Sequence, residues 1–133
     1  TWNYVTIGTA GNDTLVGVTR GGGTTDTING LSGNDDLRGG AGNDTLIYTM
    51  GENLAASDVY FGDNGTDTLE LRLTRAEFDS AAVQADIAAY QAFLAVNGNP
   101  VAIFGPFFTF TAFDLRATTF ETLNVVILNT APV

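Results

Sequence analysis

The sequence predicts a mainly β protein in which short strands and turns stack as a repeat solenoid, followed by a helix and further strands. Two observations predict this fold. Between residues 8 and 70, six stretches repeat one pattern: a turn rich in Gly, Asn or Ser, an Asp, one residue, and a large apolar residue. After residue 70 the pattern stops, and an Ala-rich stretch precedes aromatic and β-branched stretches. Units this short cannot bury an apolar face alone, so they must stack.

Composition and charge narrow the classes of function. The chain has 133 residues, the size of one domain, and 15 acidic against 5 basic residues give a net charge of -10. Nucleic acids and anionic membranes bind surfaces rich in Lys and Arg, so neither is expected as a partner. The lack of Cys and His excludes disulfides, the usual zinc sites, thiol nucleophiles and imidazole bases. The acidic excess favours cations as ligands.

We expect no signal for membrane insertion or export within the first residues of this sequence. No apolar run approaches the length of a membrane span. Residues 1–20 lack a charged start followed by an apolar core, so no signal peptide is expected there. The chain begins at Thr1 rather than Met, and we interpret it as a segment or processed piece of a longer protein.

The first predicted element is a strand over residues 1–7. Its sequence, TWNYVTI, is β-branched and aromatic. Trp2 and Tyr4 would share one face of this strand. Because an uncapped solenoid exposes its apolar core, we expect these two rings to cover the open first turn.

The repeats follow over residues 8–70. The units begin at Gly8, Gly21, Gly30, Gly39, Asn53 and Gly62. Their Asp residues are Asp13, Asp26, Asp35, Asp44, Asp58 and Asp67, and the apolar followers are Leu15, Ile28, Leu37, Leu46, Tyr60 and Leu69. Insertions GVTR and YTMGE precede the second and fifth units, and the fifth has lost its glycines. In each unit, six residues form a turn and three form a short strand with one inward apolar side chain.

Residues 71–128 predict a segment that caps the last turn. Thr74 and Glu77 form a capping box, and Val83, Ile87, Tyr90 and Leu94 recur at helical spacing, which predicts a helix over about 75–96. Asp79-Ser80 offers a second cap, so the first turn can be separate. Asn97-Gly98 and Pro100 end the helix. Strands are predicted over about 107–113 and 120–128, and residues 129–133 form a linker.

The repeats place oxygen ligands where a cation would bind. Calcium accepts six to eight oxygens, from carboxylates and backbone carbonyls, at about 2.3–2.6 Å. A glycine-rich turn points several carbonyls one way, and one Asp per turn adds charge. Two stacked turns would therefore surround a calcium ion. The alternative is a set of ordinary Asn-Asp turns without metal. The additional acids Asp36 and Asp63 either tune a site or are solvated.

The unit spacing resembles the RTX, or hemolysin-type, calcium-binding repeat, whose consensus is G-G-x-G-x-D-x-apolar-x. Residues 39–47, GGAGNDTLI, fit at every position. Other units replace one glycine, by Thr9, Thr24, Leu31 or Asp63. The resemblance implies a parallel β-roll in which consecutive units lie on opposite sides. Units 8, 30 and 53 would then stack in one ladder, and units 21, 39 and 62 in the other.

The resemblance also implies ligand sets, each combining an Asp and two carbonyls from each of two stacked units. The first set is Gly8, Ala10 and Asp13 with Leu31, Gly33 and Asp35. The second is Gly21, Gly23 and Asp26 with Gly40, Gly42 and Asp44. The third is Gly39, Ala41 and Asp44 with Asp63, Gly65 and Asp67. A fourth is Gly30, Ser32 and Asp35 with Leu54, Ala56 and Asp58, where glycines are missing. Two to four calcium ions are expected.

The resemblance implies a calcium-binding structural module of a larger secreted or cell-surface bacterial protein, folding on calcium binding outside the cell. Residues 71–128 also resemble segments that follow such repeats in very long secreted, adhesin-like proteins. Calcium ions and neighbouring domains of the longer chain would be its partners. Loose packing without calcium would suit export through a narrow channel, as in type I secretion.

Two other classes of function compete with this interpretation. A calcium-stabilised carbohydrate-binding module would need a basic, aromatic groove for a polysaccharide. The chain has five Arg residues, and we expect the Phe residues between 104 and 113 to fill the core: Phe104, Phe107, Phe108, Phe110 and Phe113. A hydrolase could use paired carboxylates. Here the repeat engages them and no nucleophile has a base beside it, so we predict a non-enzymatic protein.

Overall fold

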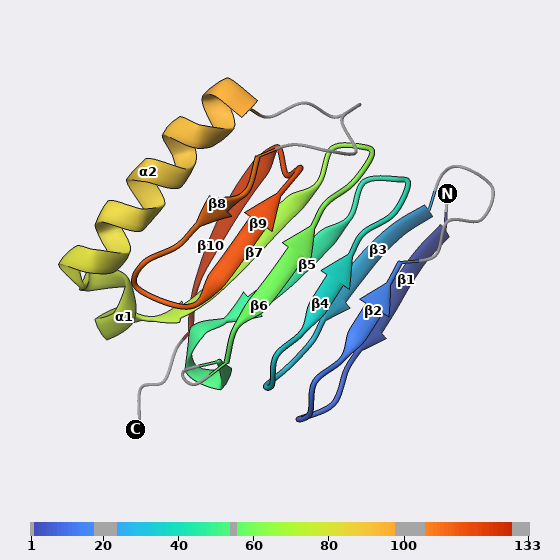
Figure 1. Ribbon diagram of the computed structural model, residues 1–133, viewed down its shortest axis with the longest axis horizontal. Coiled ribbons are helices and arrows are strands. Elements are labelled where there is room, and N and C mark those ends of the chain that lie inside the picture. Colours follow the sequence, from blue (N-terminus) through green and yellow to red (C-terminus); the bar gives the residue numbers. More distant parts are fainter. Residues whose placement is uncertain (1, 18–23, 54–55, 98–105, 129–133) are drawn as a thin grey trace.

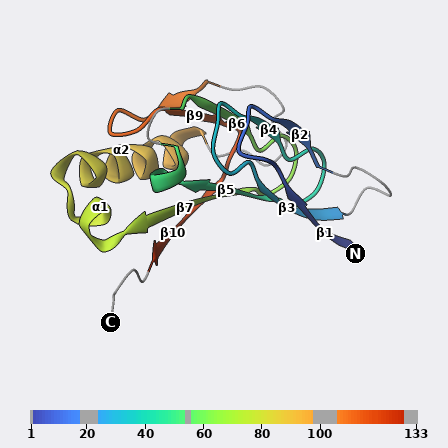
Figure 2. The same cartoon turned by 90° about the horizontal axis from the view of Figure 1, so that it is seen from below.

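A computed structural model describes residues 2–17, 24–53, 56–97 and 106–128. In these residues the chain forms two five-stranded sheets that face each other, with a helical segment at one end (Figures 1 and 2). In order, the first sheet contains β1 (Trp2–Ile7), β3 (Thr24–Asn29), β5 (Thr45–Thr49), β7 (Thr68–Thr74) and β10 (Thr122–Leu128). The second contains β2 (Thr14–Val16), β4 (Asp36–Arg38), β6 (Asp58–Phe61), β9 (Leu115–Thr118) and β8 (Phe108–Thr109).

Strand pairing follows the repeat. Consecutive units supply strands to opposite sheets, so β2, β4 and β6 pair in one ladder and β3, β5 and β7 in the other. These pairs are parallel, as are β1 with β3, β6 with β9, and β7 with β10. The short β8 pairs antiparallel with β9. The predicted mainly β architecture with parallel sheets is confirmed, and it is consistent with a β-roll.

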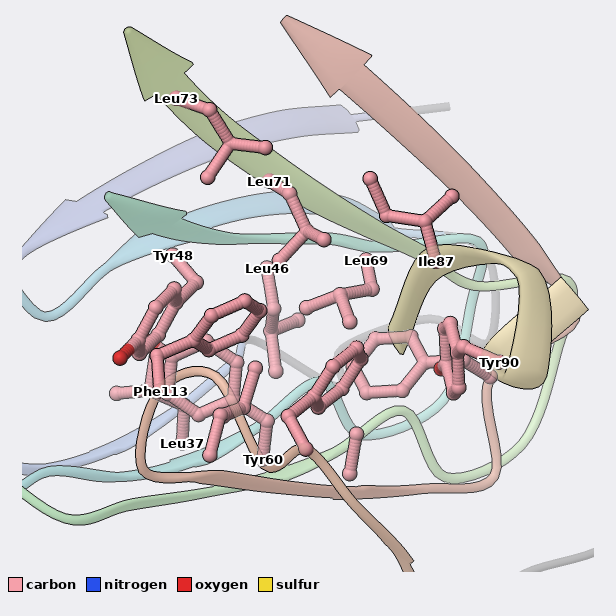
Figure 3. Packing of buried hydrophobic residues seen from close by; sticks show 14 of the residues in the cluster. Leu37, Leu46, Tyr48, Tyr60, Leu69, Leu71, Leu73, Ile87, Tyr90 and Phe113 are labelled. Carbon is pink, nitrogen blue, oxygen red and sulfur yellow. The ribbon is translucent and has the colours of Figure 1, made fainter. Parts of the chain in front are cut away.

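The core lies between the two sheets and is built from the apolar position of each unit. Ile28, Leu46 and Leu69 are in register in the first sheet, and Leu37 faces them from the second. All four are fully buried, as is Tyr60. Figure 3 shows Leu37, Leu46, Leu69 and Tyr60 in this core. Apolar side chains removed from water in this way supply the main stabilising term, at about 25 cal/mol per Å². Each unit alone offers one such side chain, which explains why the units are stable only as a stack.

The N-terminal end of the stack is the less covered one. Strand β1 forms the edge of the first sheet and β2 the edge of the second. Val5 and Ile7 are 70% and 62% exposed, and Tyr4 is half-buried. At this end Leu15 is only partly buried, unlike the equivalent residues of inner units. The side chain of Trp2 lies outside the described part of the structure.

The opposite end is closed by helices. The chain leaves β7 into α1 (Arg75–Asp79) and α2 (Ala81–Asn97), which separate at Ser80. The predicted capping box is present: Thr74 Oγ1 accepts from Glu77 N at 3.1 Å, and Glu77 Oε1 accepts from Thr74 N at 2.8 Å. Helix α2 buries Val83, Ile87 and Tyr90. Figure 3 shows Ile87 and Tyr90 within the core. The Tyr90 ring packs against those of Phe108 and Phe110, 5.0 Å between centroids. This helix is not long and apolar enough to cross a membrane, and neither is any other described helix.

Two expectations for the C-terminal segment differ from the structure. The strand predicted over 107–113 is only β8, because Asp86 of α2 accepts hydrogen bonds from the backbone N–H groups of Thr111 (2.9 Å) and Ala112 (2.7 Å) and turns the chain there. Strand β9 was not predicted at all. With β10 it extends both sheets beyond the repeats, so this segment adds a turn to the stack as well as covering its end.

The YTMGE insertion is accommodated locally. Tyr48 and Thr49 lengthen β5, and a short 3-10 helix, η2 (Met50–Glu52), follows. Asn53 closes it, with its side-chain nitrogen donating to Thr49 O at 2.9 Å. The residues that end the predicted helix, Gly98 and Pro100, lie outside the described ranges.

Candidate metal centre

The Asp of each turn bonds to the backbone of the preceding turn in the stack. Ahead of the second-sheet strands, Asp35 Oδ1 accepts from Asp13 N and Asp58 Oδ1 from Asp35 N, both at 2.9 Å. Ahead of the first-sheet strands, Asp44 Oδ1 accepts from Asp26 N and Asp67 Oδ1 from Asp44 N, both at 2.8 Å. We call these the Asp13–Asp35–Asp58 and Asp26–Asp44–Asp67 ladders. The six predicted Asp residues are thus brought into two rows.

Four of these six Asp residues have buried carboxylate oxygens without hydrogen bonds among the described residues, whereas Asp13 accepts from Thr9 and Asp58 Oδ2 accepts from the Tyr60 hydroxyl at 3.3 Å. Asp26, Asp35, Asp44 and Asp67 are at most 3% exposed. Their Oδ2 atoms, and Asp26 Oδ1, have no hydrogen-bond partner among the described residues. A carboxylate can only accept, so a donor, a proton or a cation must satisfy each oxygen. Leaving a buried charge unpaired is costly, and this cost marks the rows as candidate cation sites.

The first glycine of the turn shapes the space around these oxygens. A Cβ on Gly39 would lie 2.8 Å from Asp44 Oδ2 and 2.7 Å from the carbonyl oxygen of Gly62. A Cβ on Gly8 would lie 2.6 Å from Asp13 Oδ2 and 2.9 Å from Gly30 O. One carboxylate oxygen and one carbonyl oxygen of the next turn therefore meet at each of these positions, and only a residue without a side chain fits there.

A glycine before the predicted second unit also takes part. A Cβ on Gly17 would lie 2.7 Å from Asp26 Oδ2, and Gly17 N donates to Arg38 O at 2.8 Å, just as Gly39 N donates to Phe61 O. Gly17 thus holds the position that Gly39 holds in the next turn of its ladder. Sequence reasoning missed it because it counted Gly17 as part of the insertion. The predicted ligands Gly21 and Gly23 lie outside the described residues.

The glycine at the fourth position of the turn is required by backbone geometry. Gly33, Gly42 and Gly65 have φ of 99°, 112° and 110°, and each lies against a carbonyl of the adjacent turn. At the second position Leu31 and Asp63 adopt φ of 64° and 67° without being glycine. These two departures from the consensus therefore preserve the left-handed turn.

A second row of hydrogen bonds was not anticipated from the sequence. Asn12 Oδ1 accepts from Asn34 N at 2.8 Å, Asn34 Oδ1 from Ser57 N at 2.8 Å, and Asn43 Oδ1 from Thr66 N at 2.9 Å. These amides bond to the following turn, whereas the Asp carboxylates bond to the preceding one. The signal in the sequence is the Asn that precedes Asp in three units, which predicts a turn but not this row. Together the two rows set the spacing between turns.

The predicted ligand sets are brought together to different extents. In the first and third sets, paired turns are in contact through Asp13 with Asp35 and Asp44 with Asp67, and Gly40 N donates to Asp63 Oδ2 at 3.3 Å. Stacking also brings Ser32 Oγ within 3.4 Å of Ala10 O, and Thr24 Oγ1 within 3.4 Å of Ala41 O. The fourth set pairs Asp35 with Asp58 and buries Ala56, but Leu54 lies outside the described residues.

Burial raises the pKa of carboxyl groups in the two Asp ladders. It raises the pKa of Asp35 to about 6, of Asp44 and Asp58 to about 7, and of Asp67 to about 9. Hydrogen bonds from backbone N–H groups oppose this shift, and repulsion by the next carboxylate in the row adds to it. Burial also raises the pKa of Asp63, against which the nearby Arg38 acts. A divalent cation would take the place of these protons.

The donor set fits calcium. Each pair of stacked turns offers two carboxylates and several backbone carbonyls, the hard oxygen ligands that calcium accepts in mixed sets. Within the described ranges, no three Asp, Glu, His or Cys side chains converge to hold a metal ion. A stack of glycine-rich turns with unpaired buried carboxylates therefore defines a class of cation-binding β protein.

Comparison with known families agrees with this class. The model of the RTX calcium-binding nonapeptide repeat matches residues 7–18 and 20–55, in four copies. These residues therefore carry RTX repeats, which imply a calcium-binding module. The unit that begins at Gly62 lies beyond the matched residues, yet its Asp67 continues the ladder of Asp26 and Asp44. Comparison with curated proteins and with solved structures gives no match.

Proposed function

We propose that this chain is a calcium-binding structural module of a larger secreted or cell-surface bacterial protein, and that its two sheets form a β-roll that folds on calcium binding outside the cell. The observation that carries this proposal is the set of buried, unpaired Asp oxygens between stacked turns. Without a cation these carboxylates oppose folding by desolvation and mutual repulsion. With calcium they become ligands, so folding and binding are one event.

The proposed ions lie between successive turns of the two Asp ladders, in the four ligand sets predicted from the repeat. Asp44 and Asp35 each belong to two sets, so neighbouring ions share them. Extracellular modules bind calcium with Kd of about 10⁻⁴–10⁻³ M. An affinity in this range would leave the chain loose in a calcium-poor cytoplasm, which suits type I secretion, and ordered at millimolar calcium outside.

The test compares calcium-free and calcium-bound protein. We expect far-UV circular dichroism to gain strand signal between a chelator and a few millimolar calcium, and calorimetry to count two to four ions for the predicted sets. Magnesium at the same concentration is the control, because it demands a tighter, octahedral shell and keeps its waters. Identical spectra with chelator and with calcium would sink the proposal.

The role of the carboxylates is proposed to be structural rather than catalytic. In the ladders each Asp that accepts a backbone N–H holds one turn against the next. An acid or base in hydrolysis must instead reach a bound substrate. Addition of calcium should therefore change the stability of the chain without producing glycosidase activity on polysaccharide substrates.

A second candidate function, carbohydrate binding, is favoured by one surface on the outer face of the second sheet. The guanidinium carbon of Arg38 lies 3.8 Å from the ring centroid of Phe61, and that of Arg116 lies 5.3 Å from that of Phe107. The two rings are 5.4 Å apart. Phe107 is 40% exposed, so its predicted place in the core is wrong, whereas Phe110 and Phe113 are buried as predicted.

This surface combines aromatic rings with positively charged Arg side chains, and both suit the binding of an acidic polysaccharide. Titration of alginate into the calcium-loaded chain tests it, with Arg116→Ala as the variant and Arg75→Ala, on α1, as the matched control. Binding that disappears only in the Arg116 variant supports the second function. No binding by the wild-type chain contradicts it and leaves the calcium-dependent module intact.

A further inference from the structure

We propose that Asp67 and Glu121, with the carbonyl oxygen of Thr119, form a further calcium site outside the nonapeptide repeats. This inference rests on the proposed calcium-binding function. It concerns a segment that carries no repeat motif and that the predicted ligand sets do not include.

Register places Glu121 at the next step of the Asp26–Asp44–Asp67 ladder. Strands β7 and β10 pair in parallel with Thr68 opposite Thr122, so the residues just before them, Asp67 and Glu121, are equivalent. Glu121 Oε1 accepts from Asp67 N at 2.8 Å, the same bond that Asp67 Oδ1 makes with Asp44 N. In return, Asp67 O accepts from the N–H groups of Glu121 and Thr122, both at 3.1 Å. Glu121 therefore acts as the ladder's next carboxylate.

The oxygens of the preceding turn face this position in the same way as in the repeats. Asp67 is fully buried, and its Oδ2 has no hydrogen-bond partner among the described residues. A Cβ on Gly62 would lie 3.0 Å from Asp67 Oδ2 and would overlap the carbonyl oxygen of Thr119. Gly39 shows the same arrangement, with Asp44 Oδ2 and Gly62 O. The space that holds a cation in the proposed inner sites thus continues to the last turn.

A shorter turn accounts for the change from Asp to Glu. Residues 62–67 connect β6 to β7, whereas only residues 119–121 connect β9 to β10. Thr119 follows β9 directly, as Gly62 follows β6, and supplies the carbonyl oxygen. Its hydroxyl accepts from Asp63 N at 2.8 Å, and its φ of 60° is the left-handed conformation that Leu31 and Asp63 adopt at the second position of the repeat turns. With three residues fewer in the turn, a side chain one methylene longer reaches the ladder. Such a substitution is invisible to a nonapeptide consensus.

The site would connect the repeats to the segment that covers their end. Phe120 beside Glu121 is buried in the same core as Val83 and Tyr90 of α2. A cation held between Asp67 and Glu121 would hold β10 against β7 at its first residue. Calcium would then order the C-terminal segment together with the repeats.

Ion counting with a matched pair of variants tests the site. Native mass spectrometry of the whole chain in calcium compares wild type with Glu121→Gln and Glu52→Gln. Gln keeps an acceptor for Asp67 N but removes the charge, and Glu52 is an exposed residue of η2. We expect Glu121→Gln to bind one calcium ion fewer than wild type, and Glu52→Gln to bind as many. Equal counts for all three would overturn the site but not the proposed function, which fails in this experiment if wild type binds no calcium.

A measurement on the wild-type chain covers the case in which Glu121→Gln does not fold. The carboxyl carbon resonance of Glu121 is followed by NMR during a calcium titration. We expect it to shift together with that of Asp67, while the Glu52 resonance stays in place. A Glu121 resonance that does not move as the protein saturates with calcium would rule out the site.

Discussion

At the scale of single residues, this protein separates two roles of one carboxylate. In Asp35, Asp44 and Asp67 one carboxylate oxygen accepts a backbone N–H and sets the spacing of the turns. The other oxygen has no hydrogen-bond partner among the described residues, so it is left for a ligand. Amide side chains can perform the first role, as Asn12, Asn34 and Asn43 do in the parallel row. Only a carboxylate can perform the second with charge, so Asp→Asn variants separate structure from calcium binding.

Asp44→Asn should therefore fold like wild type but bind calcium less strongly. Asp44 belongs to two predicted ligand sets, and each site filled at tenfold its Kd adds about 1.4 kcal/mol of stability. We expect a loss of about 3 kcal/mol for Asp44→Asn and about 1.4 kcal/mol for Asp13→Asn, which belongs to one set. Urea unfolding in calcium measures both, with exposed Asp79→Asn as control. Equal losses for Asp44 and Asp13 would show that ions do not share Asp44.

Two glycines, Gly42 and Gly11, predict a second contrast. A Cβ on Gly42 would overlap Thr24 O at a φ of 112°, whereas a Cβ on Gly11 would have Thr9 Oγ1 as its nearest neighbour, 3.6 Å away. Gly42→Ala should cost more than about 2 kcal/mol, because backbone strain adds to the overlap. Gly11→Ala should cost little. Thermal unfolding in calcium compares the two, and similar melting temperatures would contradict the role assigned to the left-handed glycine at Gly42.

At the scale of elements, one buried carboxylate shapes the segment that covers the stack. Asp86 on α2 is 5% exposed and accepts from Thr111 N, Thr111 Oγ1 and Ala112 N at 2.7–2.9 Å. These bonds end β8 and direct the chain into β9. Helix α2 thereby positions a strand distant from it in the sequence.

Asp86→Ala should remove the hydrogen bonds that hold Thr111 and Ala112 against α2. Net contributions of hydrogen bonds to a charged group are about 1.5–3 kcal/mol, and three donors would lose their acceptor, so we expect a loss of about 3 kcal/mol or more. Hydrogen exchange should show faster exchange at Thr111 and Ala112 while the amides of β3 and β5 stay protected. If the β3 and β5 amides lost protection equally, α2 would be part of one cooperative unit with the repeats rather than a separable cover.

The elements also differ in whether they could be predicted from the sequence. Alternation of units between two sheets could be predicted, because the resemblance to the RTX repeat implies it. The capping box at Thr74 was predictable because it is local. Strand β9 was not, since Leu115–Thr118 has no glycine turn before it and is defined by pairing with β6. The roles of Gly17, Glu121 and Asp86 likewise depend on neighbours distant in sequence.

At the scale of the whole molecule, the chain has 15 acidic residues and 5 basic ones. Its stability therefore depends on how the negative charge of the carboxylates is neutralised. Calcium is one means, and protonation is the other. Burial raises the folded-state pKa of Asp35, Asp44, Asp58 and Asp67 from 3.8 to about 6, 7, 7 and 9. Without calcium, the folded chain therefore binds more protons than the unfolded chain at pH values between 3.8 and about 9.

Because the folded state binds more protons, stability in calcium-free buffer should be greatest near pH 4 and fall as the pH rises from 3.8 towards 9. Self-repulsion of the net charge acts in the same direction. In saturating calcium the trend should reverse, since protons compete with calcium for the same oxygens and affinity rises with pH. Melting temperatures measured across this range with and without calcium should therefore converge at low pH and diverge at high pH. A calcium-free protein that becomes more stable from pH 5 to pH 8 would contradict the assignment of these carboxylates as buried cation ligands.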